Sequence, residues 1–221
     1  MVVGIAFIAL SQVKPSGAAA AFFANAETKK IVSAARAAYS KMKTARFTIT
    51  AGKDIKRYSF ATGKMSSAQG GLQWTFSSRR LTVMKDNKLY RGVVSAPNVN
   101  GWLIRAGSPP ERLPIELLNG RNPIDILLAP GSRVRKVGTM NLGNVNTDLV
   151  EIKSPGLRVS LGIRSDNHLI VDISAENTDK RGNVLFRSSR SVSWTSVNKP
   201  LPSSAFTLGT GKAPLPLKTL R

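Results

Sequence analysis

The stretch Leu157-Arg158-Val159-Ser160-Leu161-Gly162-Ile163-Arg164 alternates apolar residues with polar or small ones along its whole length. Because successive side chains of a β-strand point to opposite faces, this period of two predicts a strand with one apolar and one polar face. Such strands are typical of antiparallel sheets that pack one face on a core and expose the other to water. The stretch therefore predicts a mostly antiparallel β protein.

Eight further segments of the chain have the same period. The segments that alternate in this way are 45–50, 57–60, 72–76, 80–83, 88–90, 102–104, 168–174 and 184–194. Asp86-Asn87 and Asn100-Gly101 precede two of them and are typical turn pairs. Two regions differ: 27–43 has the three- to four-residue period of a helix, and 109–130 contains two short apolar turns that interrupt the strands.

These elements together predict the fold class. One-sided strands need a cover for their apolar faces, and the two helical regions are the only candidates in the sequence. We therefore expect an α+β, mostly antiparallel fold, a strongly curved and incomplete β-barrel of about ten strands. The N-terminal helix and a short helical lid insert would cover it. A length of 221 residues with 42% apolar residues fits one folded core.

The N-terminus differs in composition from the rest. Val2 to Leu10 is apolar but too short to span a bilayer as a helix, and Ala24-Asn25-Ala26 resembles a signal-peptidase site. We therefore predict a signal peptide at 1–26 and export to the periplasm or cell envelope, with an uncleaved apolar anchor as the alternative. The folded domain would then be 27–209, followed by a Pro- and Lys-rich, loosely packed tail at 210–221.

The net charge is strongly positive, because 33 Lys and Arg face 12 Asp and Glu, a balance of +21. Such a field attracts anionic partners. The arginines that alternate with apolar residues, and so are expected to face outward, are Arg46, Arg57, Arg80, Arg158, Arg164 and Arg187. They form a solvated basic face, dock on an anionic membrane surface, or bind nucleic acid. No nucleic-acid-binding motif accompanies the charge, and the export signal also argues against that third interpretation.

Residues for catalysis or metal binding are scarce. The chain has no cysteine and one histidine, His168, which is expected at the surface. Gly209-Thr210-Gly211-Lys212 lacks the first glycine and the Ser or Thr of a phosphate loop. Asp172, Glu176 and Asp179 lie near a strand end, where turn residues and a catalytic pair look alike. We therefore expect no enzyme activity, no cofactor and no metal.

At this point the order of elements resembles the LolA/LolB-like family of periplasmic lipoprotein carriers. The segments that carry the resemblance are Ala38-Tyr39-Ser40-Lys41-Met42 leading into Arg46-Phe47-Thr48-Ile49, then Gly71-Leu72-Gln73-Trp74-Thr75-Phe76 and Thr82-Val83-Met84-Lys85-Asp86-Asn87-Lys88-Leu89-Tyr90, and the closing 171–173, 181–183, 198–202 and 205–208. The similarity covers about 27–209. The family's basic-proline turn is replaced by Ser77-Ser78-Arg79-Arg80, and there is no lipobox cysteine, as in the soluble carrier.

The resemblance implies a groove for an acyl chain beneath a movable lid. The expected groove residues are Phe47, Ile49, Tyr58, Phe60, Trp74, Leu81, Val83, Trp102 and Phe186; an ordinary filled core of the same residues is the alternative. The expected lid residues are Leu117, Leu118, Ile126 and Leu127, and Arg79 is the nearest candidate for the family's lid-contacting arginine.

The function expected from these observations is transport of a lipid or lipoprotein acyl chain across the cell envelope by a monomer that docks on an anionic membrane surface. The main alternative is an envelope sensor or scaffold protein of the same fold. Such a protein would have a filled core and would bind a protein partner through its basic face.

Overall fold

The computed structural model describes residues 24–108, 111–128, 130–179, 181, 183–208 and 213–220. The expected signal peptide lies outside the described residues, except for its last three positions. The described chain divides into two compact units. Unit 1 contains residues 24–41 and 122–192, and unit 2 contains residues 42–121 and 193–220. The strand β11 (Val184–Val197) begins in unit 1 and ends in unit 2.

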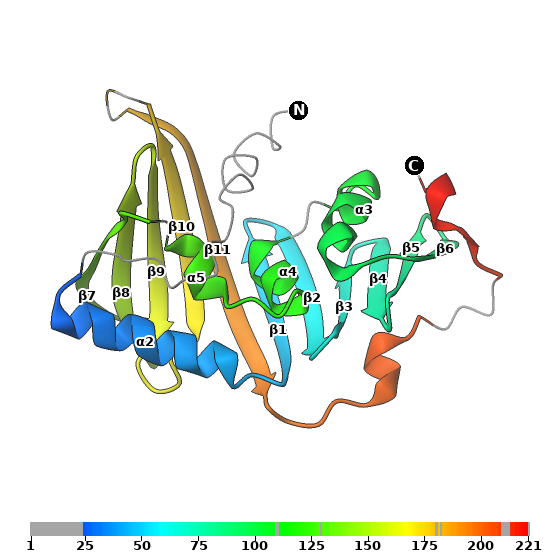
Figure 1. Cartoon of the computed structure of the whole chain (residues 1–221), viewed down its shortest axis with the longest axis horizontal. Helices are drawn as coiled ribbons and strands as arrows, with labels where there is room; N and C mark the ends of the chain where they lie inside the picture. The colour runs from blue at the N-terminus through cyan, green and yellow to red at the C-terminus, as the bar shows by residue number, and fades with distance from the viewer. Residues whose placement is uncertain are drawn as a thin grey trace. The chain divides into compact units, whose positions relative to one another are not determined.

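Unit 2 is built on a meander of six strands (Figure 1). These are β1 (Thr44–Ala51), β2 (Asp54–Ala61), β3 (Lys64–Gln69), β4 (Leu72–Ser77), β5 (Arg80–Lys85) and β6 (Lys88–Val93). Each strand pairs antiparallel with the next, and two residues connect each pair. The expected Asp86-Asn87 turn is confirmed, since both residues have positive φ, 48° and 60°, as a type I′ hairpin turn requires.

Unit 1 contains the other long strands. They are β7 (Arg133–Leu142), β8 (Val145–Ser154), β9 (Leu157–Arg164), β10 (Ile170–Thr178) and the first part of β11, again paired antiparallel in sequence order. The opening stretch Leu157–Arg164 is β9, as predicted, with Val159, Leu161 and Ile163 at most 2% exposed.

The helix α2 (Ala26–Ser40) crosses the strands of unit 1. Asn25 caps its start, with the side-chain oxygen accepting from the Thr28 amide at 2.9 Å. Near that end Thr28 Oγ1 accepts from the Lys136 amide of β7 at 2.9 Å, and near the other end the buried Tyr39 hydroxyl accepts from the Ile170 amide of β10 at 3.1 Å. The two bonds hold the helix across four strands.

The insert between β6 and β7 contains three helices, α3 (Val99–Arg105), α4 (Arg112–Leu118) and α5 (Pro123–Leu127). The first two belong to unit 2 and the third to unit 1. Asn122 fixes α5, since its oxygen accepts from the Ile124 amide and its nitrogen donates to the carbonyl of Arg36 in α2. The expected lid insert is therefore two separate covers, one in each unit.

The C-terminal segment is packed more closely than we expected from its prolines. It contains the short helix η2 (Ser203–Phe206), the strand β12 (Leu215–Pro216), which pairs parallel with β6, and η3 (Leu217–Thr219). Leu217 and Leu220 are 4% and 1% exposed. Leu217 lies so close to Gly92 that a Cβ there would be 2.7 Å from the leucine Cβ, so a side chain at Gly92 would displace the tail.

The expected fold class is confirmed. Among the described residues the sheet has twelve strands, in the order β12-β6-β5-β4-β3-β2-β1-β11-β10-β9-β8-β7, and because its two edges are different strands it is not closed. Four strands, β3, β7, β8 and β12, were not predicted. The predicted strand at 102–104 is wrong, because these residues lie in α3.

Candidate functional site

Seven of the nine expected groove residues lie together on one face of unit 2, which we call the apolar face. They are Phe47, Ile49, Tyr58, Phe60, Trp74, Leu81 and Val83, and none is more than 5% exposed. The register explains why they meet: Phe47 pairs with Tyr58, Trp74 pairs with Val83, and Ser67 lies between these two pairs. The Phe47 ring stacks on Tyr58 at a centroid distance of 5.1 Å and contacts the Trp194 ring at 4.7 Å.

The short helix α4 packs on the β2 part of the apolar face. It contacts β2, and the residues it buries are Leu113, Pro114, Ile115, Glu116, Leu117 and Leu118. Leu117 and Leu118, two of the four expected lid residues, are 6% and 4% exposed. A seven-residue helix has little helical stability of its own, so α4 depends on its packing against the sheet.

A buried ion pair fixes the start of this helix. The Lys56 ammonium on β2 lies 3.5 Å from the carboxylate of Glu111, the residue that precedes α4, and both residues are 6% exposed. Lys56 shares the face of Tyr58 and Phe60, because strand residues two apart point the same way. This pair was not predicted; the spacing of two places Lys56 on the apolar face but does not identify Glu111 as its partner.

Glu116 is a second buried carboxylate in the cover. Its side chain is 10% exposed and lies 3.7 Å from Arg112 and 3.8 Å from Arg121. Burial raises the pKa of Glu116 above its ordinary value of 4.5, and the two arginines only partly oppose that shift. The charged form of Glu116 is therefore less favourable in the folded protein than it would be in water.

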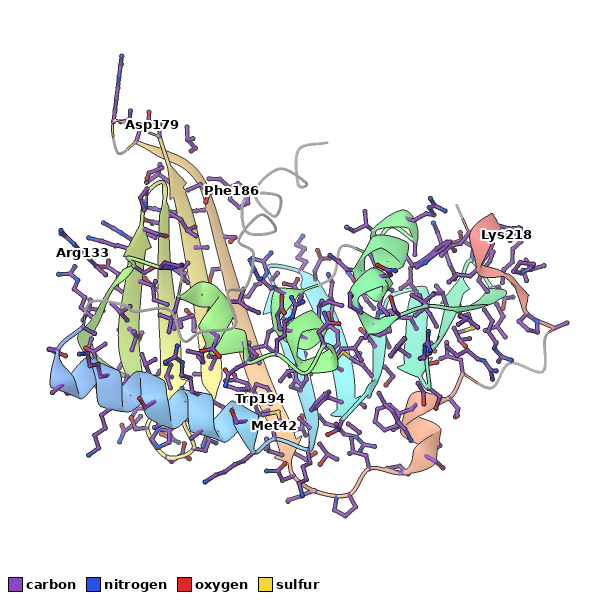
Figure 2. The ribbon with its side chains drawn as sticks, viewed as in Figure 1. Met42, Arg133, Asp179, Phe186, Trp194 and Lys218 are labelled. Carbon is purple, nitrogen blue, oxygen red and sulfur yellow. The ribbon has the colours of Figure 1, made fainter. Side chains whose placement is uncertain are left out.

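The structure places the remaining expected site residues elsewhere. Trp102 lies on α3, partly exposed, with the Arg105 guanidinium 4.9 Å from its ring centroid. Ile126 and Leu127 lie on α5, in unit 1. Phe186 lies on β11 in unit 1 and is 37% exposed (Figure 2). Arg79 lies in the two-residue turn between β4 and β5, exposed and with a φ of 61°.

The six outward arginines are all at least partly exposed, as predicted. Those in unit 1 are held by carboxylates. Arg187 contacts Glu176 at 2.6 Å, Arg158 contacts Glu176 at 3.5 Å, and Arg164 contacts Asp166 at 2.6 Å. Asp166 has its pKa lowered chiefly by its hydrogen bond to Arg164.

The three carboxylates near the end of β10 do not gather around one point of chemistry. Glu176 pairs with arginines, and the Asp179 carboxylate accepts from the amides of Arg181 and Asn183 at 2.8 Å, which closes the turn into β11. Burial raises the pKa of Asp172. No group of three or more His, Asp or Glu residues suited to a metal occurs in the described part of the chain. Nor is any helix described here long and apolar enough to cross a membrane.

Sequence comparison gives no relative. No protein-family model matches the chain, and no curated protein matches it.

Comparison of structures does give similar folds. The structure of LprF from Mycobacterium bovis matches over 80% of this chain and 96% of that chain, with 9% identity and a TM-score of 0.50. A chain of the MucA/MucB complex of Pseudomonas aeruginosa matches over 83% and 62%, with 12% identity and a TM-score of 0.42. An outer membrane lipoprotein-sorting protein domain from Vibrio parahaemolyticus matches over 81% and 97%, with 10% identity and a TM-score of 0.35.

The likeness to LprF shows the fold alone, given an identity of 9%. It supports the curved, open antiparallel sheet expected from the sequence, and the other two structures are too remote to add to that conclusion. This chain spans 64% of the length of MucB.

The raised pKa of Glu116 makes a prediction about stability. Folding favours the protonated carboxyl, so the free energy of unfolding should fall as pH rises from 4.5 through the raised pKa. Glu116→Gln imitates the protonated form. We expect it to be more stable than the wild type at pH 7, with this advantage gone at pH 4, as measured by urea unfolding at both values.

The wild type supplies the control for the other carboxylates, because they titrate in both proteins. A Glu116→Gln variant that is less stable than the wild type at pH 7 would show that attraction to Arg112 and Arg121 outweighs the cost of burial.

Proposed function

We propose that this chain is an exported, non-enzymatic carrier that holds the acyl chain of a lipid or lipoprotein between the apolar face of unit 2 and α4. One observation carries the proposal. Seven large apolar side chains, none more than 5% exposed, form one face, and a helix of only seven residues packs on that face at β2.

The energetics of such a carrier need no catalytic residue. Each buried methylene gains about 0.8 kcal/mol, so an acyl chain of about sixteen carbons gains on the order of 10 kcal/mol on leaving water. Moving the same chain from a bilayer into an apolar groove is close to neutral by this count. A carrier therefore needs an apolar face and a cover that can move aside.

The ion pair between Lys56 and Glu111 suits a cover that opens. Burying two charges costs solvation free energy, and their attraction repays it only in part, so a buried pair contributes little net stability. It fixes where α4 sits when closed. When α4 moves away, both charges regain water, which offsets the loss of their contact.

The cover also has to move before a ligand binds, because side chains that are at most 5% exposed already contact protein. In the closed state these residues form an ordinary core, as the alternative interpretation of the sequence holds. A sensor or scaffold protein would keep that core filled at all times. The two functions therefore differ in whether the apolar face accepts a ligand.

Ser67 offers a direct test of the carrier. It pairs with both Tyr58 and Trp74 on the apolar face and is 8% exposed. Ser67→Leu would fill the space between these aromatic rings, and we expect it to weaken binding of a fluorescent fatty acid at least about tenfold, the loss of roughly two methylene contacts. Fluorescence titration measures the change.

The matched control is Ser77→Leu, which adds the same side chain to the opposite face of β4 and should bind as the wild type does. Overpacking at Ser67 is expected to lower the free energy of unfolding by about 1–3 kcal/mol, so thermal unfolding is recorded for both variants. If Ser67→Leu does not fold, the smaller substitution Ser67→Val is used in its place. A folded Ser67 variant with wild-type affinity, or a wild type that binds no fatty acid, would contradict the carrier.

We assign docking on an anionic bilayer to the β10–β11 hairpin of unit 1. Val184, Leu185 and Phe186 follow its turn and are 45%, 69% and 37% exposed. Arg181 and Arg187 flank them and are exposed as well. Apolar tips bordered by cations suit the boundary between acyl chains and anionic headgroups, where each nearby basic residue adds about 1 kcal/mol. Phe186 thus belongs to this docking tip.

We expect Leu185→Ser to lower binding to phosphatidylglycerol-containing vesicles about ten- to hundredfold, since burying a leucine gains about 1.5–3 kcal/mol. Vesicle sedimentation measures the binding.

The matched control is Leu142→Ser, also at an exposed leucine of unit 1, but in the turn at the opposite end of the strands. Equal losses for the two variants, or equal binding to vesicles of phosphatidylcholine alone, would contradict docking through the hairpin.

A further inference from the structure

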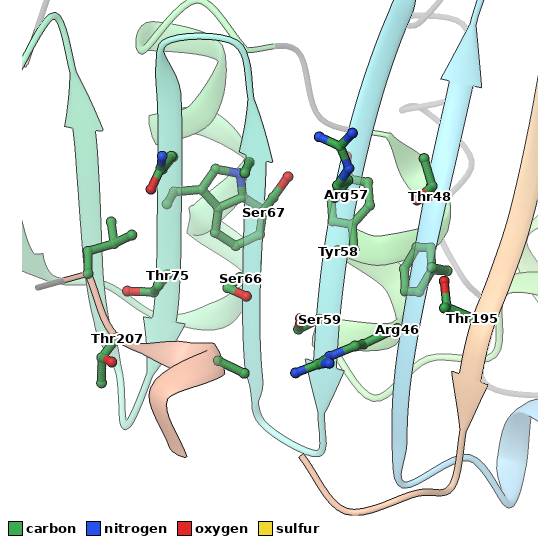
Figure 3. Close-up of a pocket in the computed structure, with 16 residues that line it drawn as sticks. Arg46, Thr48, Arg57, Tyr58, Ser59, Ser66, Ser67, Thr75, Thr195 and Thr207 are labelled. Carbon is green, nitrogen blue, oxygen red and sulfur yellow. The ribbon is translucent and has the colours of Figure 1, made fainter. Parts of the chain in front are cut away.

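The polar face of unit 2, on the side of the sheet opposite the apolar face, carries a groove of about 360 Å³ (Figure 3). Its floor is two cross-strand rows of side chains. One row is Arg46, Ser59, Ser66 and Thr75, and the other is Thr48, Arg57, Ala68 and Gln73. All of these residues alternate with the buried ones, so they point away from α4.

The C-terminal segment forms one wall of this groove. Ala205, Thr207 and Leu208 line it, together with Thr195 of β11. Phe206, next to Ala205, is 9% exposed and anchors the segment against the sheet. The Thr207 hydroxyl donates to the Ser204 carbonyl at 3.2 Å. The groove therefore has a floor formed by the sheet and a wall formed by the C-terminal segment, whereas an uncovered sheet face would be flat.

The charge of the groove is unbalanced. Arg46 and Arg57 lie diagonally across the β1–β2 pair, and neither makes an ion pair with a described carboxylate, whereas the arginines of unit 1 named above do. No Asp or Glu is among the residues that line the groove. Two guanidinium groups without a counter-charge beside a concave surface attract an anion.

The remaining groove side chains identify what kind of anion fits. The Ser and Thr hydroxyls both donate and accept hydrogen bonds, as does the Gln73 amide. They repeat at the spacing of neighbouring strands, about 4.8 Å, and so can bond several hydroxyl groups of one ligand. A guanidinium binds phosphate through two parallel hydrogen bonds. Together these groups complement a molecule with a phosphate and several hydroxyls.

The same face is poorly suited to nucleic acid. Single-stranded nucleic acid is bound largely by stacking of its bases on aromatic rings. The three aromatic residues along the groove, Phe47, Tyr58 and Trp74, belong to the apolar face and are 2%, 5% and 3% exposed. Their rings are therefore not available on the polar side.

We propose that this groove is a second binding site, for a phosphorylated sugar or polyol. Arg46, whose guanidinium lies beside Ser59 (Figure 3), binds the phosphate, Arg57 adds positive charge toward the other end of the groove, and Ser59 and Ser66 bind the hydroxyls. The site is independent of the carrier function, since the side chains that bind its ligand lie on the other face of the sheet, whereas those of Phe47, Tyr58 and Trp74, which also border the groove, belong to the apolar face.

Calorimetric titration of the full chain with myo-inositol 1-phosphate tests the proposal. Inositol, which has the hydroxyls alone, and inorganic phosphate, which has the phosphate alone, are the controls. Each should bind at least tenfold more weakly than inositol 1-phosphate. Arg46→Gln with Arg57→Gln should lower the affinity for inositol 1-phosphate at least tenfold. Ser66→Leu should lower it as well, by filling the floor of the groove.

The matched control is Lys64→Gln with Arg80→Gln. It removes two positive charges from the same face of the meander, outside the groove, and should stay within about twofold of the wild type. A loss equal to that of the Arg46 and Arg57 variant would reduce the effect to net charge and overturn the site. Tighter binding of a single-stranded oligonucleotide, abolished by the same variant, would overturn it in favour of nucleic acid.

Phosphatidylinositol vesicles distinguish the two sources of this chemistry. Binding to soluble inositol 1-phosphate and not to the vesicles identifies a free ligand. Binding to both identifies a lipid headgroup. The Arg46 and Arg57 variant should keep its fatty-acid affinity, so failure of this site and failure of the carrier are separate results.

Discussion

Two-residue turns between consecutive strands are the constraint on which the rest of unit 2 depends. They hold β1 to β6 in a fixed register, in which each side chain has a defined partner on the next strand. A slip of one residue would move every side chain to the other face. The turns therefore keep Phe47, Tyr58 and Trp74 on one face and Arg46, Arg57 and Ser66 on the other. One sheet therefore carries an apolar surface on one face and a polar, basic surface on the other.

The two surfaces are covered by different parts of the chain, and by different interactions. On the apolar side α4 is held by burial of its leucines and by the pair of Lys56 with Glu111, which sets position more than stability. On the polar side the segment after β11 is anchored by Phe206 and leaves a groove beside it. Burial raises the pKa of Glu116 in α4. The negative charge of this side chain would therefore be more favourable if α4 moved away and exposed it to water.

The sequence predicted the fold class and most of the apolar face, because a period of two is a strong local signal wherever the core side of a strand is fully apolar. The prediction was wrong or incomplete where the core side of a strand is not fully apolar. β7 has one buried side chain, Val134, near its start and is mostly exposed beyond it, so its residues show little alternation. Trp102 to Ile104 have the residue types of a strand, but they lie in α3, directly after Gly101, in a short helix that tertiary packing stabilises. The Lys56–Glu111 pair joins residues 55 positions apart, a separation that no local pattern reveals. The same holds for the groove wall at Ala205, which only the return of the chain from β11 places beside Ser66.

The central claim is that the apolar face of unit 2 accepts an acyl chain beneath α4. Native mass spectrometry of the full chain, purified without detergent from the cells that express it, tests this claim most directly. We expect a population whose mass exceeds that of the polypeptide by the mass of an acyl lipid, and the return of this population when delipidated protein is incubated with a fatty acid. A bare polypeptide mass in both samples would contradict it and would leave a filled core as the state of the protein.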